Sequence, residues 1–300
     1  MTSLATALAA GVVVLDGGLS TELESRGHDV TSALWSARLL RDDPQAIADA
    51  HAAFAAAGAQ VATTASYQAT LPGFAAAGID GAEAATLIAR SVQLARDGMA
   101  AAGTTGWVAG SVGPYGAYLA DGSEYRGDYV PVVPVAALRE FHRPRLELLA
   151  AAGADVLACE TLPAAAEVEA LLAEVDRLGV PAWLSLTAVT GDDGVPRTRR
   201  GEPLADVLAM ARDVRSVVAV GVNCTEPAGV VRAVEVAAGA GRPVVAYPNS
   251  GEVWDAAHRR WTGSPGVGDV GGWLAAGARL VGGCCRVRPA DVRAIAAAVR

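Results

Sequence analysis

Eight short apolar runs recur along the 300-residue chain, and each is followed by a loop and a stretch rich in Ala and Leu. The runs are apolar at consecutive positions, which is typical of parallel strands that are buried on both faces. They predict strands at residues 12–18, 59–66, 107–113, 155–163, 181–188, 217–225, 243–251 and 278–285. The Ala/Leu-rich stretches predict helices at 44–57, 83–102, 135–152, 164–178, 203–213, 227–239 and 289–299, and the apolar N-terminal stretch predicts a short helix before the first strand.

Strand and helix alternate in eight units, which predicts an α/β protein with a (β/α)8 TIM-type barrel. An open doubly wound sheet is the alternative, but no G-x-G-x-x-G follows any predicted strand. The chain shows no linker or break in composition, so we expect one domain over residues 1–300. Two loops, at 114–133 and at about 250–268, are longer than a bare barrel needs, and loops of this kind are usually binding loops or lids.

Composition excludes several classes of protein. The chain carries 24 basic and 32 acidic residues, a net charge of −8, so it lacks the basic surface that binds nucleic acid or an anionic membrane. All the basic residues are arginine, and without lysine neither Schiff-base nor pyridoxal-phosphate chemistry is available. The few cysteines, the absence of a leader with a cleavage site and the absence of a membrane-length apolar run predict a cytoplasmic protein.

Polar residues follow most of the predicted strands, and in a barrel the chemistry lies at the carboxyl ends of the strands. In chain order these residues are Asp16-Gly17-Gly18, Thr63-Thr64, Ser111, Gly113, Glu160-Thr161, Thr187, Asn223-Cys224, Asn249 and Cys284-Cys285. No histidine or arginine falls at a predicted strand end. We interpret all four histidines, His28, His51, His142 and His258, as solvated surface residues.

Three of the four cysteines meet at this rim. Cys284 and Cys285 are neighbours, and neighbours on a regular strand point to opposite faces. The two glycines before them permit backbone angles closed to other residues, so the chain can turn and bring both sulfurs to one point, where Cys224 arrives from the sixth strand. Three thiolates with one open position define a catalytic zinc site.

Other interpretations of these cysteines stay open on composition alone: buried apolar thiols, a strained vicinal disulfide, or a thiol nucleophile. The nucleophile is disfavoured because the rim offers no histidine base. Cys159 lies beside Glu160 on the fourth strand, so if Glu160 faces the mouth, alternation turns Cys159 toward the helices as an inert core thiol.

The strand-end motifs resemble those of the homocysteine S-methyltransferases. The resemblance runs nearly end to end, through "LDGGLSTELESRGHDVTSALWSARLL", "GSVGPYGAYLADGSEYRGDY", "ACETLP", "GVNC", "YPNSGEVWD" and "GGCCR". It implies a barrel that binds Zn²⁺ through Cys224, Cys284 and Cys285. It also implies transfer of a methyl group from S-methylmethionine or S-adenosylmethionine to the thiol of homocysteine.

The remaining strand-end residues supply candidate contacts for such substrates. Asp16 and Glu160 are the acids at strand ends and are expected to receive the homocysteine ammonium, although a turn role for Asp16 and an arginine ion pair for Glu160 are the alternatives. The amides of Gly17 or Gly18 and the Thr64 hydroxyl are expected to receive the carboxylate. Asn249 would orient either substrate. The loop after the third strand carries four tyrosines, Tyr115, Tyr118, Tyr125 and Tyr129. They could face a sulfonium or simply pack the loop.

Among methyl donors we expect a free sulfonium. S-Methylmethionine is preferred because the resemblance is closest to the branch that uses it and because no glycine-rich nucleotide loop is visible. The 15 residues after Cys285 leave no room for a cobalamin domain, and the rim offers no general acid to activate a folate. The alternatives from other classes are a metal-free barrel hydrolase and a non-catalytic homocysteine-binding or thiol redox module.

Overall fold

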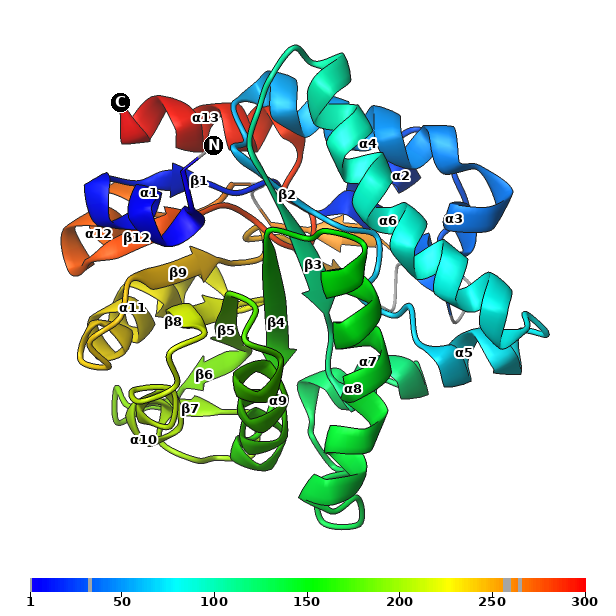
Figure 1. Ribbon diagram of the computed structural model, residues 1–300. Coiled ribbons are helices and arrows are strands. Elements are labelled where there is room, and N and C mark those ends of the chain that lie inside the picture. Colours follow the sequence, from blue (N-terminus) through cyan, green and yellow to red (C-terminus); the bar gives the residue numbers. More distant parts are fainter. Residues whose placement is uncertain (1, 32–33, 256–259, 264–265) are drawn as a thin grey trace.

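The computed structural model describes residues 2–300 apart from 32–33, 256–259 and 264–265. Its main sheet has eight parallel strands in the order β1-β12-β9-β8-β5-β4-β3-β2. A parallel bridge between Leu15 and Val61 joins the two ends of this sheet, and Gln60 N–H donates to Val14 O at 2.8 Å beside it. The sheet is thus a nearly closed barrel surrounded by helices (Figure 1), and the predicted fold is confirmed.

The barrel strands all lie inside the predicted apolar runs and are shorter than them. They are β1 (Val13–Val14), β2 (Val61–Thr63), β3 (Trp107–Val112), β4 (Val156–Leu162), β5 (Ala182–Leu186), β8 (Val217–Asn223), β9 (Val244–Tyr247) and β12 (Ala278–Val281). Regular pairing therefore stops before most of the polar strand-end residues. Those residues lie on irregular backbone at the rim, where each can be directed individually.

The helices follow the predicted alternation. They are α1 (Leu4–Ala10), α2 (Leu19–Ser25), α3 (Leu39–Asp42), α4 (Pro44–Ala57), α5 (Leu71–Ala76), α6 (Gly81–Ala101), α7 (Tyr115–Leu119), α8 (Val135–Ala151), α9 (Ala165–Leu178), α10 (Leu204–Ala209), α11 (Val230–Ala238), α12 (Val270–Ala276) and α13 (Pro289–Val299), with 3-10 turns η1 (Trp35–Arg38), η2 (Ser123–Tyr125) and η3 (Pro227–Gly229). The short helices α2, α3, α5, α7 and α12 were not predicted. Within the described residues, no helix has the length and apolar character needed to span a bilayer.

Two short antiparallel pairs lie outside the barrel and were not predicted either. One is formed by β6 (Ala188–Thr190) and β7 (Pro196–Thr198) after the fifth barrel strand, and the other by β10 (Val253–Asp255) and β11 (Arg260–Thr262) inside the long loop after β9. Their strands have only three residues each, too short to produce a recognisable alternation. The β6–β7 pair leads into a turn that lies at the rim of the barrel.

Two apolar layers stabilise the barrel. The inner layer fills the barrel with alternate strand residues such as Val156, Ala158 and Trp183, and Leu4 and Leu8 of α1 pack against it. The outer layer lies between the strands and the surrounding helices. Because the lumen is packed with side chains, the cavity that concerns the strand-end residues lies at the carboxyl ends of the strands.

Two histidines that we interpreted as surface residues are buried. His51 on α4 is 1% exposed, and His142 on α8 is 0% exposed. His142 hydrogen-bonds Glu167 on α9 at 2.9 Å, whereas the ring nitrogens of His51 have no partner among the described residues. His28 is half-buried. His258 lies outside the described residues. The interpretation was wrong for His51 and His142 because helix–helix packing covers the faces on which they lie.

Candidate metal centre and substrate cavity

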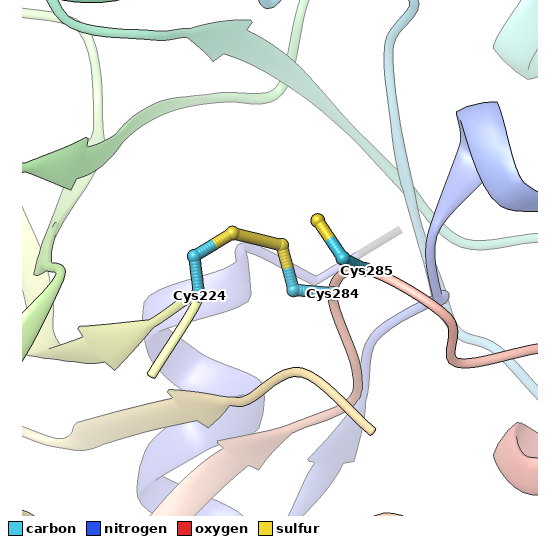
Figure 2. A group of neighbouring side chains, drawn as sticks. All are labelled: Cys224, Cys284 and Cys285. Carbon is cyan, nitrogen blue, oxygen red and sulfur yellow. A yellow bond between two sulfur atoms is a disulfide. The ribbon is translucent and has the colours of Figure 1, made fainter. Parts of the chain in front are cut away.

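Three cysteines converge at the carboxyl end of the barrel. Cys224 directly follows β8, while Cys284 and Cys285 follow β12 through two glycines. Their three sulfur atoms all lie within 4.8 Å of one another. Figure 2 shows the side chains directed toward one point from two different segments. We call these residues the rim cysteines.

Backbone contacts fix the turn that brings Cys284 and Cys285 together. Cys284 N–H donates to Pro248 O at 2.7 Å, and Cys285 N–H donates to Asn249 Oδ1 at 3.2 Å. Asn249 thus holds the cysteine segment, and it is not among the residues that line the cavity. Cys224 itself has φ 46°, a left-handed conformation that is uncommon for a residue with a side chain and that often occurs at functional sites.

We expected the two glycines before Cys284 to adopt backbone angles that are closed to other residues, and the structure shows a different role. Neither has a positive φ. A Cβ atom on Gly282 would lie 2.5 Å from Leu15 Cβ, and one on Gly283 would lie 2.1 Å from Val287 Cγ1. These glycines are therefore required for close approach of neighbouring segments, because any larger residue would push the cysteine turn away from the first strand.

Cys224 and Cys284 are joined by a disulfide, and Cys285 is a free thiol. The vicinal pairing of Cys284 with Cys285, one of our alternatives, is therefore not what the structure shows. Two sulfurs bound to one tetrahedral zinc lie about 3.8 Å apart when each is ~2.3 Å from the ion. The separation of the rim cysteines fits this geometry once the disulfide is reduced, so the donor set suits a soft or borderline metal ion.

The fourth cysteine behaves as predicted. Cys159 on β4 is 2% exposed and packs in the outer layer, between the sheet and the helices. Burial raises the pKa of its thiol to about 12. It is therefore protonated and unreactive at neutral pH.

Asp16 lies at the end of the first strand and lines the cavity. Its carboxylate accepts hydrogen bonds from the N–H and the hydroxyl of Thr63 at 2.6 and 2.8 Å, so it bridges to the next strand and does not close its own turn. Burial, and to a smaller extent the neighbouring Glu160, raise the pKa of Asp16 to about 7. A pKa this high indicates that no cation stabilises the charged form of the buried acid. The ammonium group of a ligand would supply that positive charge.

Glu160 on β4 shares the cavity with Asp16. It accepts hydrogen bonds from Ser111 and from Tyr247, the latter at 2.9 Å. Burial raises its pKa, and these two hydrogen bonds and the more distant charge of Arg145 lower it in part. Within the described residues neither acid forms an ion pair with a protein cation, so the cavity can accept a ligand ammonium.

The expected carboxylate contacts are only partly available. Gly18 N–H donates to Val287 O at 2.9 Å, so the Gly18 amide is occupied, whereas the Gly17 amide has no partner among the described residues. Thr64 Oγ1 accepts from Ser111 N–H at 3.0 Å. Because Ser66 Oγ donates to Ser111 O, the Thr64 hydroxyl must donate to Ser66 and has no proton left for a ligand. Thr64 thus shapes the cavity wall, and Gly17 remains the candidate anion contact.

Several cavity residues were missed by the sequence analysis, among them Gln68 and Tyr67. Gln68 is 4% exposed, and its Nε2 donates to Ala117 O at 2.9 Å while its Oε1 has no partner among the described residues. That oxygen can accept a hydrogen bond from a ligand. Tyr67 also lines the cavity. Both precede a helix that begins at Leu71, and no strand-end pattern marked them.

The loop tyrosines divide into two groups. Tyr115, Tyr118 and Tyr129 stack on one another or on Phe141, so they pack the loop. Tyr125 lines the cavity, and its hydroxyl hydrogen-bonds the Cys285 sulfur. A hydrogen bond to a metal-binding sulfur orients the ligand and lowers the negative charge on it.

The fold and the site define a class: a barrel with three cysteines that could hold a metal ion, beside two buried acids. The family model for homocysteine S-methyltransferase matches residues 13–299. Homocysteine S-methyltransferase of Escherichia coli (strain K12) is 47% identical over 302 residues, covering 95% of this chain and 94% of the relative. The chain belongs to the homocysteine S-methyltransferase family.

Solved structures agree with this assignment. The metallated form of the homocysteine methyltransferase MmuM from Escherichia coli matches with a TM-score of 0.83 and 46% identity, covering 96% of both chains. Its oxidized form matches with a TM-score of 0.84 and 46% identity, covering 95% of both chains. The relative has thus been solved both with metal and in an oxidized state, and the chain resembles both.

Proposed function

We propose that this enzyme transfers a methyl group from a sulfonium donor to the thiolate of homocysteine, and that Cys224, Cys284 and Cys285 would hold the zinc ion that activates this thiolate. The observation that carries the proposal is the convergence of three sulfurs within 4.8 Å beside the acid pair, Asp16 and Glu160. When bound, the zinc would supply the positive charge that keeps the substrate thiol ionised at neutral pH.

The acid pair orients the acceptor. Both carboxyl groups are buried in the cavity wall and form no ion pair with the described residues, so the homocysteine ammonium would donate a charge-assisted hydrogen bond to each. The free Gly17 amide would receive the carboxylate. These contacts hold the amino-acid end of homocysteine and leave its thiol free to reach the rim cysteines.

The transfer step itself requires no acid or base. The lone pair of the homocysteine sulfur forms a bond to the methyl carbon, and the bond between that carbon and the donor sulfur breaks. The bonding pair stays on the donor sulfur, which becomes a neutral thioether, and homocysteine becomes methionine. The thiol proton has left earlier, to solvent water, when homocysteine bound. This agrees with the part of the cavity lining that the structure describes, which contains no histidine.

The charge of the site favours a cationic donor. The acid pair and the sulfurs of the rim cysteines make the cavity electronegative, which attracts a sulfonium and disfavours an anionic folate. S-Methylmethionine is our preferred donor, with S-adenosylmethionine as the second. A reducing compartment such as the cytoplasm suits this function, because metal binding needs thiolates and not the disulfide of Cys224 with Cys284.

The decisive experiment joins metal analysis to a donor screen. Reduced protein reconstituted with zinc should hold about one ion and form methionine from homocysteine and a sulfonium, without cobalamin. Cys285→Ser should lose both metal and activity, whereas the matched control Cys159→Ser should keep both because Cys159 lies in the outer layer. Activity with methyltetrahydrofolate alone, or a fully active metal-free Cys285→Ser protein, would contradict the proposal.

The disulfide between Cys224 and Cys284 supports one alternative, a thiol redox module without catalysis. Such a protein would cycle between disulfide and dithiol but would transfer no methyl group in its reduced state. The same screen separates the two functions. Methionine formation by the reduced, zinc-loaded protein excludes the non-catalytic module.

A further inference from the structure

Among the described residues, the cavity lining provides no cation for the second carboxylate that the reaction brings in. This part of the lining has the acid pair and the rim cysteines but no arginine or histidine. Homocysteine and an amino-acid sulfonium each carry an α-carboxylate, and the free Gly17 amide can serve only one of them. A positive group is therefore needed near the mouth, outside the lining residues.

Arg199 lies at the mouth although no barrel strand ends in it. It directly follows β7, in the turn that connects the β6–β7 pair to α10. This turn is fixed on both sides of Arg199: Thr198 N–H donates to Glu202 O at 2.9 Å, and Arg200 N–H donates to Pro163 O just after β4 at 3.2 Å. The backbone of Arg199 is thus attached to the rim of the barrel.

The guanidinium of Arg199 is held against two partners of the rim cysteines. Its Nε donates to Thr187 Oγ1 at 3.1 Å, and that hydroxyl donates to Cys224 O at 3.1 Å. Its central carbon lies 5.8 Å from the centre of the ring of Tyr125, whose hydroxyl bonds the Cys285 sulfur. The cation is therefore placed between the strand end that carries Thr187 and the loop that carries Tyr125.

The outer nitrogens of this guanidinium are available to a ligand. In the described part of the chain, the Nε contact with Thr187 is the one hydrogen bond of the Arg199 side chain, and no carboxylate lies within 4.0 Å of it. Glu226, which attracts it from a distance, is exposed. Arg199 is half-buried, and partial burial lowers its pKa. A partly desolvated cation without a counter-ion favours binding of an anion.

We infer that Arg199 binds the α-carboxylate of the sulfonium donor, with its two outer nitrogens paired to the two carboxylate oxygens. The inference rests on the proposed function and deepens it. The contact fixes the amino-acid end of the donor at the mouth while the sulfonium reaches into the electronegative cavity. Arg199 therefore selects amino-acid sulfoniums over sulfoniums that lack a carboxylate.

The test compares two donors and two variants on the reduced, zinc-loaded enzyme. The donors are S-methylmethionine and (3-aminopropyl)dimethylsulfonium, which is the same molecule without its carboxylate. The variants are Arg199→Met and the control Arg197→Gln, whose arginine lies on the same hairpin but is paired with Asp193 at 2.6 Å. Measurements are kcat/KM for each donor, KM for homocysteine, and calorimetric binding of S-methylmethionine.

Arg199→Met should weaken binding of S-methylmethionine and lower kcat/KM for it about tenfold or more, because one charge-assisted carboxylate contact is lost. The kcat/KM for the decarboxylated donor and the KM for homocysteine should not change, and Arg197→Gln should behave as wild type. An equal loss with both donors, or a raised KM for homocysteine, would overturn the inference. If wild type binds S-methylmethionine through Arg199 but transfers no methyl group, the proposed function fails and this carboxylate site stands.

Discussion

Replacing Glu160 with glutamine should weaken homocysteine binding without weakening the fold. The substitution removes the negative charge and keeps the shape of the side chain. Ser111 and Tyr247 hold the two carboxylate oxygens, and both are hydroxyl groups that can donate or accept, so an amide can be accommodated. Burial disfavours the charged form of Glu160 and raises its pKa, so removing the charge relieves a cost of folding.

The expected loss of affinity follows from the missing ion pair. A hydrogen bond between charged groups contributes about 1.5–3 kcal/mol, which is roughly tenfold to a hundredfold in Kd. The assay is calorimetric titration of the zinc-loaded protein with homocysteine, at a pH above about 7, where Asp16 is ionised. As a ligand control, 4-mercaptobutanoate lacks the ammonium and should bind wild type and Glu160→Gln equally well.

A second buried glutamate provides the control variant. Glu174 on α9 is buried like Glu160, but it is paired with three arginines, Arg139, Arg143 and Arg177, at 2.8 to 2.9 Å. Glu174→Gln should lower the melting temperature and leave homocysteine affinity unchanged, the opposite of Glu160→Gln. Unchanged homocysteine binding by Glu160→Gln, together with a lower melting temperature, would refute our reasoning and make Glu160 a structural residue.

Three further predictions concern pH and redox state. Because its arginine partners lower the pKa of Glu174 to about 2, its stabilisation should be present above about pH 4.5 and be lost as pH falls toward 2, so urea unfolding of Glu174→Gln should depend less on acid pH. Homocysteine binding should strengthen as pH rises through about 7 and Asp16 ionises, and Asp16→Asn should flatten this part of the calorimetric profile. Oxidised protein, in which Cys224 and Cys284 form the disulfide, should take up no zinc until a dithiol reductant is added, as thiol titration and metal analysis can show.

The sequence by itself determined the barrel and the location of its site. Consecutive apolar residues specify strands buried on both faces, and caps specify helix limits: α4 begins after Asp43, which caps Ala46 N–H, and ends at Gly58 with φ 112°. These signals act over a few residues, so they can be read without knowing the fold. Because all barrel strands are parallel, their carboxyl ends share one rim, and this placed the rim cysteines and the acid pair together.

Only the tertiary structure decided which polar atoms remain free for a ligand. Thr64 and Gly18 were candidate contacts by position, but their hydrogen atoms are engaged by Ser66 and Val287. Arg199 was missed because it is brought to the rim by a short hairpin and not by a strand end. Hydrogen-bond partners are set by segments distant in the chain that fold side by side, as between Gly18 and Val287, and a local pattern of residues carries no information about them.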